Sequence, residues 1–465
     1  MIRDIEADSE LSELRILSPT AILGYGFPEA SFRRGLERRP HAIAVDAGST
    51  DPGPYYLGSG ISFTDRSAVR RDLKLILEAG RELNIPVIIG SAGGAGAKPH
   101  LEWTLEIVRE IASASGLRGS LAIINADIDR ERVLSAFREN GITPLTPGQA
   151  LSENDITESS QIVAQMGEEP LIAALQDGAD VILAGRSYDP AVFAALPISL
   201  GFDRGLALHM GKILECAAIA ASPGSGSDCM LGTLYRDAFV VEPLSDDRVC
   251  TIASVAGHSL YEKSNPYVLP GPGGSLDLTN TAFEQIDERR VRVSGSMFIP
   301  AKSYFVKLEA ARRMGFRTIS IAGARDPAFI VGFDKIVEGV RKRTAENFRE
   351  IDQSSYTIRF IVYGRDGVMG DLEPDRTEIS HEIGIVIDVT AASQELADTL
   401  CAFTRSTLLH FGYPGRMSTG GNLALPYSPS DFQAGEVYEF SLYHLMAVED
   451  PGNAFLRKMA RLEER

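Results

Sequence analysis

An arginine and an aspartate follow closely after a largely apolar segment near the middle of the chain. Residues 179–184 (ADVILA) have the length and composition of a buried strand, and they lead into the turn GRSYDP, which contains Arg186 and Asp189. In open α/β sheets, ligands bind beyond the carboxyl ends of the strands. We therefore expect Arg186 to bind an anionic group and Asp189 to act as an acid or base. The alternative is an ion pair that holds a loop.

Polar residues also follow other expected strands. Asp46 ends a strand expected over residues 41–46 and Ser49 lies in the loop after it, and Asn125 and Asp127 come after a strand expected over residues 120–124. Asp127 has an alternative role as the anion that steadies the helix expected from about residue 130. Carboxylate and imidazole side chains at strand ends can act as general acids or bases. The expected acids and bases are Asp46, Asp127, Asp189, Glu215 and His410.

The most glycine-dense turn of the chain is GSAGGAGAK, residues 90–98, between an expected strand and an expected helix. Backbone N–H groups in such a turn suit an anion, although a structural turn has the same composition. Its spacing is not that of a Walker A loop. A second glycine-rich segment, residues 409–430, contains His410, Arg416 and Asn422 in a long loop of the kind that is often functional. The expected substrate-binding residues are Ser49, Gly93, Gly94, Lys98, Asn125, Arg186, Arg416 and Asn422.

No residue spacing requires a cofactor or a metal ion. Oxygen atoms of Asp46, Asp127 and Glu215 would suit Mg²⁺ if a divalent ion took part. The turn Gly24-Tyr25-Gly26 lacks the third glycine of the dinucleotide fingerprint. An NAD-dependent oxidoreductase is therefore the least favoured of three possible functions.

Expected strands and helices alternate through the first half of the chain, a pattern typical of a doubly wound, mostly parallel sheet. Residues 222–228 (SPGSGSD) break the pattern, and later segments favour strands. We therefore predict a Rossmann-like α/β domain over residues 1–235. An α+β domain with a mixed sheet over residues 236–465 would complete the site and form the oligomer or partner interface.

The bulk composition is that of a globular protein. The 465 residues are 44% hydrophobic and 23% charged, and the formal net charge is −17. Such an acidic chain disfavours nucleic acid and anionic membranes, which bind clustered cations. Four dispersed cysteines argue against a disulfide framework. The polar N-terminus and the absence of a run of about 18 apolar residues lead us to expect a cytoplasmic protein.

Several segments together resemble the acyclic terpene utilisation (AtuA) family. They are ADVILAGRSYDPAVF with GKILEC, GSAGGAGA at residues 90–97, EEPLIAALQDGA at 168–179, and NPYVLPGPGGSLDLT with RVRVSG within 265–295. The resemblance runs from about residue 12 to 445. Many members have a Trp-Gly-Asp-type turn where this chain has Tyr25-Gly26-Phe27-Pro28.

This resemblance implies a short family member without the C-terminal ferredoxin-like domain, accompanied by a small ferredoxin-like subunit. It implies a role in the catabolism of branched carboxylic acids or their CoA thioesters, and we expect a hydro-lyase or a carbon–carbon lyase. The main alternative is a non-catalytic acyl-CoA or nucleotide-binding subunit of a hetero-oligomer.

Overall fold

The computed structural model describes residues 11–145, 150–261, 264–375, 377–378, 380–417 and 420–464. The fold is mixed α/β, as the sequence predicts. Its elements form two compact units. Unit 1 comprises the residues up to Arg312 together with those from Phe440 onward, and unit 2 comprises Arg313–Glu439. Within the described residues, no helix is long and apolar enough to cross a membrane.

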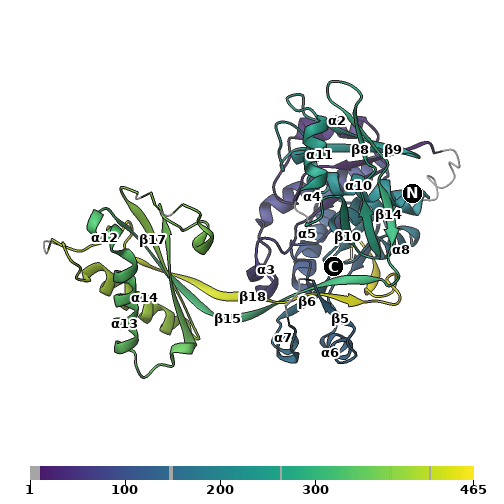
Figure 1. The fold of residues 1–465 in the computed structure, drawn as a ribbon. Helices are drawn as coiled ribbons and strands as arrows, with labels where there is room; N and C mark the ends of the chain where they lie inside the picture. Colours follow the sequence, from purple (N-terminus) through teal and green to yellow (C-terminus); the bar gives the residue numbers. More distant parts are fainter. Residues whose placement is uncertain are drawn as a thin grey trace. The chain divides into compact units, whose positions relative to one another are not determined.

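A ten-stranded sheet of the described residues forms the centre of unit 1 (Figure 1). Its middle strands are parallel and lie in the order β1, β2, β3, β7 and β4. Every residue of β2 is buried, as expected for a parallel strand covered on both faces. The bounds are β1 Glu13–Ser18, β2 Ala42–Asp46, β3 Val87–Gly90, β7 Val181–Ala184 and β4 Ser120–Ile124.

Antiparallel strands extend this sheet at both edges. On the side of β1 lie β8 (Met230–Tyr235), β9 (Ala238–Pro243), β13 (Val291–Ser294) and β12 (Ala282–Gln285), and β19 (Arg457–Arg461) pairs with β4. The predicted domain boundary at residue 235 therefore falls inside the β8–β9 hairpin of a continuous sheet. The compact units divide instead at residues 312/313 and 439/440.

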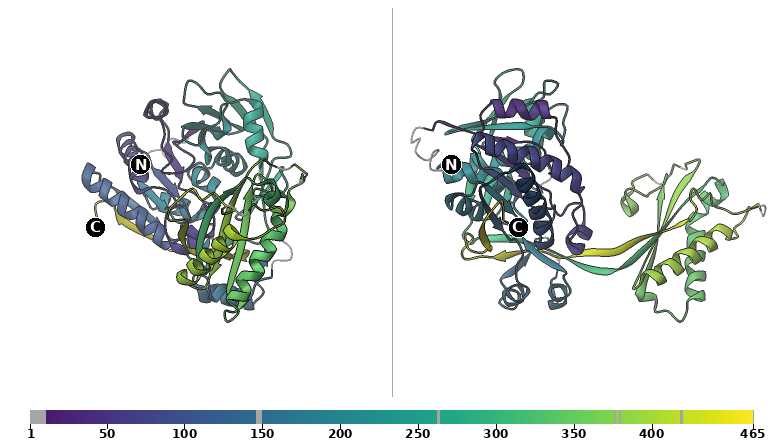
Figure 2. Two further views of the ribbon diagram at one scale, coloured as in Figure 1. Left: turned by 90° about the vertical axis from the view of Figure 1, so that its left-hand side faces the viewer. Right: turned by 180° about the vertical axis from the view of Figure 1, so that it is seen from behind.

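Helices cover both faces of the sheet (Figures 1 and 2), because successive strand side chains alternate between the faces. Ile43 and Val45 of β2 pack with α2 (Glu29–Glu37), α4 (Arg66–Leu83) and α5 (Lys98–Ser115). The opposite face contacts α9 (Asp189–Ser199) and α10 (Arg204–Leu214). The remaining helices of unit 1 are α3 Pro54–Ser59, α6 Arg130–Arg138, α7 Glu153–Thr157, α8 Glu169–Gln176, α11 Ile252–Leu260 and the 3-10 helix Ala217–Ala220.

Shorter strands complete unit 1. A three-stranded antiparallel sheet, β10 (Val268–Gly271), β11 (Gly274–Asp277) and β14 (Met297–Pro300), contacts α10. Strand β6 (Gln161–Ala164) pairs with residues 308–311 of β15 (Phe305–Ala324). Strand β5 (Ile142–Pro144) pairs with residues 444–446 of β18 (Asp431–Ala447).

Unit 2 has a β-α-β-β-α-β element order that is typical of ferredoxin-like folds. Strands β15 and β18 lead into and out of it, and the sheet order is β16, β17, β15 and β18. Helices α13 and α14 lie on one face of the sheet (Figure 1) and share an apolar core with it. The bounds are α12 Pro327–Val331, α13 Phe333–Asn347, β16 Tyr356–Tyr363, β17 Ile383–Ala391 and α14 Gln394–His410, with 3-10 helices at Gln353–Ser355 and Gly370–Leu372.

Candidate functional site

The carboxyl ends of β2, β3 and β7 lie side by side, and buried polar groups meet just beyond them. Asp46, the last residue of β2, pairs with Gly90 of β3. Ser91 follows β3, and its Oγ atom accepts hydrogen bonds from Arg186 Nη1 and from the Ser187 backbone, each at 3.3 Å. Ser91 has a left-handed φ of 46°, a conformation that a residue other than glycine adopts at a cost and that often marks functional sites.

Arg186 is the centre of this arrangement and is only 2% exposed. Its Nη1 atom donates to Asp189 Oδ1 at 2.9 Å, and its Nε atom donates to Glu309 Oε2 at 2.7 Å. Its remaining nitrogen, Nη2, makes no hydrogen bond within the part of the chain that the structure describes. Asp46, Ser91, Arg186, Asp189 and Glu309 are called the strand-end cluster below.

Glu309 is fully buried on β15, far along the chain from the other members of the cluster. Although burial opposes ionisation, the positive charges of Arg186 and Lys307 lower the pKa of Glu309 to about 2. Lys307 Nζ lies 2.6 Å from Glu309 Oε1, and the Thr50 hydroxyl donates to the same oxygen at 3.0 Å. Glu309 is therefore a fixed negative charge that holds Arg186 in place.

Asp46 has a buried carboxyl group whose pKa is shifted upward. It is 5% exposed, and its Oδ1 atom has no hydrogen-bond partner among the described residues. Burial and the nearby negative charge of Asp189 raise the pKa of Asp46 well above its ordinary value, against the opposing effects of Arg186 and the Ser91 hydroxyl. Asp46 consequently keeps a proton to a higher pH than an exposed aspartate does.

A second buried ion pair adjoins the cluster at the end of α10. Lys212 Nζ lies 2.5 Å from Glu215 Oε1, and both residues are buried. The negative charge of Glu215 contributes to the raised pKa of Asp46, so the two carboxyl groups interact. Burial and the same charge raise the pKa of the Tyr188 hydroxyl. Tyr188 therefore remains a neutral hydrogen-bond donor.

The glycine-rich turn packs closely against this site. A Cβ atom on Gly96 would lie 2.2 Å from the backbone nitrogen of Arg186, and its φ of +68° also favours glycine. Gly93 and Gly94 pack in the same way against His100 and Phe63. However, the Gly94 N–H donates to the Ser91 carbonyl at 2.8 Å. The Gly94 amide is thus not free to bind an anion, in contrast to the prediction.

Three further predicted residues lie together at the start of α5. The Asp127 carboxyl accepts a hydrogen bond from the Lys98 backbone, and burial raises its pKa to about 6. The Asn125 side chain accepts from the Asp127 N–H at 3.2 Å. The Lys98 side chain points away, 64% exposed and 3.9 Å from Glu102. Asp127 therefore supports α5, and α6 is capped by Asp129 instead of Asp127.

The other predicted residues have local roles. Ser49 accepts a hydrogen bond from the Asp51 N–H at 3.1 Å and shapes the loop after β2. His410 is exposed at the end of α14 in unit 2. Arg416 Nε donates to the Asn422 side chain at 2.7 Å, and the Asn422 amide donates to the Leu408 and Phe411 carbonyls. His410, Arg416 and Asn422 all belong to unit 2.

Sequence reasoning missed Ser91, Tyr188, Lys212, Lys307 and Glu309. One signal could have identified two of them. Lys307 and Glu309 alternate with apolar residues in FVKLEA, which places two opposite charges on one face of an otherwise buried strand. Their position opposite Arg186 follows from tertiary pairing, which one sequence does not reveal.

A cavity of about 350 Å³ is lined by Thr50, Asp51, Phe440 and Tyr443. Thr50 bonds to Glu309, and the Tyr443 hydroxyl accepts from Lys307 Nζ at 3.0 Å. Two residues that line the cavity are therefore bonded to the charged side chains of β15, one of which, Glu309, forms an ion pair with Arg186. Its size is within the usual range for small-molecule sites.

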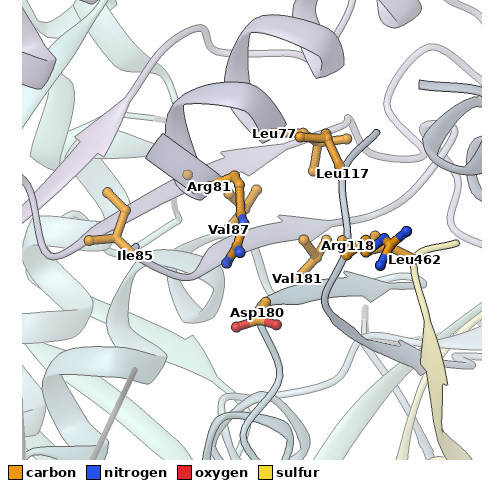
Figure 3. Close-up of a pocket in the computed structure, with 10 residues that line it drawn as sticks. Leu77, Arg81, Ile85, Val87, Leu117, Arg118, Asp180, Val181 and Leu462 are labelled. Carbon is orange, nitrogen blue, oxygen red and sulfur yellow. The ribbon is translucent and has the colours of Figure 1, made fainter. Parts of the chain in front are cut away.

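Figure 3 shows a different pocket, at the opposite edge of the sheet, where Val87 and Val181 begin their strands. Its volume is about 20 Å³, which is enough for one water molecule. Its lining is mainly apolar, and Asp180 in it already bonds to Ser120. We assign this pocket no chemistry. Among the described residues, no three His, Cys, Asp or Glu side chains are arranged to hold a metal ion. A role for Mg²⁺ at Asp46, Asp127 and Glu215 stays a prediction.

The fold and the cluster define an α/β protein with a buried polar site at the carboxyl ends of its parallel strands. The profile of the acyclic terpene utilisation family protein AtuA matches residues 66–225 and 237–429. The chain belongs to this family, as the sequence motifs predict. No curated protein and no solved structure gives a significant match.

Proposed function

We propose that this protein is a catabolic enzyme that acts on a branched carboxylic acid or its CoA thioester as a hydro-lyase or carbon–carbon lyase. The observation that carries the proposal is the buried Asp46 carboxyl with an unpartnered oxygen and a raised pKa. A carboxylate with a raised pKa is a stronger base near neutral pH than an ordinary one. The family name, acyclic terpene utilisation, fits a catabolic role.

In the proposed reaction, Asp46 removes a proton from the carbon next to the substrate carbonyl. The electron pair of the broken C–H bond moves toward the carbonyl oxygen, where the Tyr188 hydroxyl and Arg186 Nη2 donate hydrogen bonds to the developing enolate. In a hydro-lyase reaction, the electron pair then returns and expels the hydroxyl group on the neighbouring carbon, which takes the proton from Asp46 and leaves as water. In a carbon–carbon lyase reaction, Asp46 instead removes the proton of that hydroxyl group, a carbonyl forms there as the carbon–carbon bond breaks, and the bond electrons become the enolate, which Asp46 then protonates. Glu309 and Asp189 keep Arg186 oriented throughout, because they bind its other two nitrogens.

The test uses Asp46→Asn, with Asp72→Asn as the matched control. Asp72 is also a buried aspartate with a raised pKa, but its Oδ2 atom accepts hydrogen bonds from the Gly24 and Gly26 N–H groups. Both variants and the parent would be incubated with branched acids and their CoA thioesters, and products would be followed by mass spectrometry. We expect Asp46→Asn to retain binding and lose turnover, and folded Asp72→Asn to keep turnover. Equal turnover of Asp46→Asn and the parent would refute the role of Asp46.

A non-catalytic acyl-CoA or nucleotide-binding subunit is the second candidate. It is favoured by the internal ion pairs of Arg186, since Nε and Nη1 are already occupied by Glu309 and Asp189. Ligand-induced stabilisation without turnover in any variant or mixture would support it. An NAD-dependent oxidoreductase ranks third, because the Gly24 and Gly26 N–H groups bond to Asp72 and are not free for a phosphate.

The proposal includes a small ferredoxin-like companion subunit and a homo- or hetero-oligomeric state. The family resemblance supports the companion, and unit 2 itself has the same element order. Size-exclusion chromatography of the chain alone and with the companion tests both points. Repeating the turnover assay with Mg²⁺ or EDTA tests a metal requirement.

A further inference from the structure

Two neighbouring hollows lie on the helix-covered side of unit 2. One hollow, of about 400 Å³, is lined by residues of α12 and the start of α13, and the other, of about 470 Å³, by the end of α13 and the end of α14. Phe411 and Gly412 line both hollows, so the two lie next to each other. Each is large enough for part of a small ligand. We call the two hollows together the helix groove.

The second hollow is rich in hydrogen-bond donors. Arg343 and Asn347 lie one helical turn apart on α13, and Ser406, Thr407 and His410 lie on one face of α14. No acidic side chain lines it. Arg343 and His410 make no ion pair or hydrogen bond among the described residues. Two such unpaired basic side chains in a chain with a net charge of −17 favour an anionic ligand here.

The first hollow is mainly apolar. Val331 is 70% exposed, and Ile336 and Pro414 line the same surface. An exposed apolar surface that adjoins a cationic one suits a ligand with an apolar chain and a charged head. Lys335 lies at this end as well and adds a further positive charge.

The loop that follows α14 builds the groove. Phe411 packs against α13 at Gly339, where a Cβ atom would lie 2.3 Å from the Phe411 ring. The Asn422 side-chain amide donates hydrogen bonds to the Phe411 and Leu408 carbonyls, and the Asn422 side-chain oxygen accepts one from Arg416. The residues that the sequence singled out in this loop therefore position Phe411 between the two hollows. A glycine inside a helix costs about 1 kcal/mol relative to alanine, and the close approach of Phe411 explains its use at 339.

We propose that the helix groove binds an amphipathic anion. The carboxylate or phosphate head lies between Arg343 and His410, with the hydroxyl groups of Ser406 and Thr407 as further donors. The apolar chain lies over Phe411 toward Val331 and Ile336, where it loses contact with water. This site lies within unit 2 and does not depend on the function proposed for unit 1.

The experiment is calorimetric titration of the full chain with decanoate and decyl phosphate below their micelle concentrations, with inorganic phosphate and decanol as head-only and tail-only probes. We expect the two amphiphiles to bind more tightly than either partial probe. Arg343→Gln should weaken their binding by roughly 10- to 100-fold, the effect of one lost hydrogen bond to a charged group. Lys342→Gln is the matched control, because Lys342 is exposed on the same helix and does not line the groove.

Val331→Asp tests the apolar half of the groove. Because Val331 is exposed, we expect this variant to fold. It should weaken binding of both amphiphiles and leave the affinity for inorganic phosphate unchanged. A sedimentation assay with phosphatidylglycerol vesicles decides the source of the head group. Vesicle binding that depends on Arg343 assigns the groove to a membrane lipid, and its absence assigns it to a soluble amphiphile. No binding of either amphiphile, or equal losses in the Arg343 and Lys342 variants, would overturn the proposal.

Discussion

Replacing Glu309 by glutamine should be strongly destabilising, because Glu309 is the buried counterion of two cations. Its Oε2 atom lies 2.7 Å from Arg186 Nε and its Oε1 atom 2.6 Å from Lys307 Nζ. Glutamine retains one acceptor oxygen, but its amide NH₂ group must face a cation or the Thr50 hydroxyl, and the negative charge is lost. Removing one partner of a buried ion pair costs about 3–5 kcal/mol. For a unit of more than 300 residues, with an unfolding entropy of about 2.1 cal/mol/K per residue, this corresponds to a decrease of about 4–7 °C in Tm.

Thermal unfolding followed by circular dichroism measures this effect, and Glu153→Gln is the control. The Arg138–Glu153 pair has a similar distance of 2.9 Å, but both side chains are about half exposed. We expect the control to match the parent. The low pKa of Glu309 means that its contribution to stability is present above pH 4.3 and decreases as pH falls toward 2. The difference between Glu309→Gln and the parent should therefore shrink in acid. A decrease no larger than that of the control at pH 7 would refute the reasoning.

Three further predictions concern the same unit. Because the pKa of Asp46 is raised, the folded parent binds a proton that the unfolded chain has lost, and its stability decreases as pH rises above about 4. The Tm of Asp46→Asn minus that of the parent should therefore increase from pH 4 to 7. A constant or falling difference would contradict this. Gly96→Ala should destabilise more than Gly116→Ala in urea unfolding, because both have positive φ but a Cβ at 96 would meet Arg186 while one at 116 meets nothing within 4 Å; equal losses would exclude the steric explanation. Burial raises the pKa of the Cys216 thiol to about 12, so we expect a disulfide reagent at pH 8 to react much more slowly with it than after denaturation, and rapid labelling of the native protein would refute this.

Much of the fold followed from local pattern. The sequence pattern predicts a strand over residues 356–363 and a helix over about residues 393–410, and these are β16 and α14, the latter within one residue. The pattern also predicts two strands, over residues 303–308 and 317–321, but the structure has one long strand there, β15. Arg312 and Arg313 lie between the two predicted strands. They are satisfied by ion pairs with Asp155 and Glu436, partners that sequence patterns do not reveal.

For the candidate site, the sequence by itself determined which strand ends carry polar side chains. Asp46, Asp189, Arg186 and Glu215 were identified because each follows or adjoins a buried apolar segment, and hydrophobic periodicity is a local property. The family motifs were likewise visible in the printed sequence.

Tertiary structure alone decided which of these groups interact and which do not. Glu309 of β15 contacts Arg186, which is 123 residues earlier in the chain. Asp127 lies at the start of α5, and His410 and Arg416 belong to a separate compact unit. The tertiary structure also decided the pKa of Asp46, since burial and the proximity of Asp189 cause that shift. Burial and proximity depend on how distant segments pack, and a single sequence specifies that packing only through the complete fold.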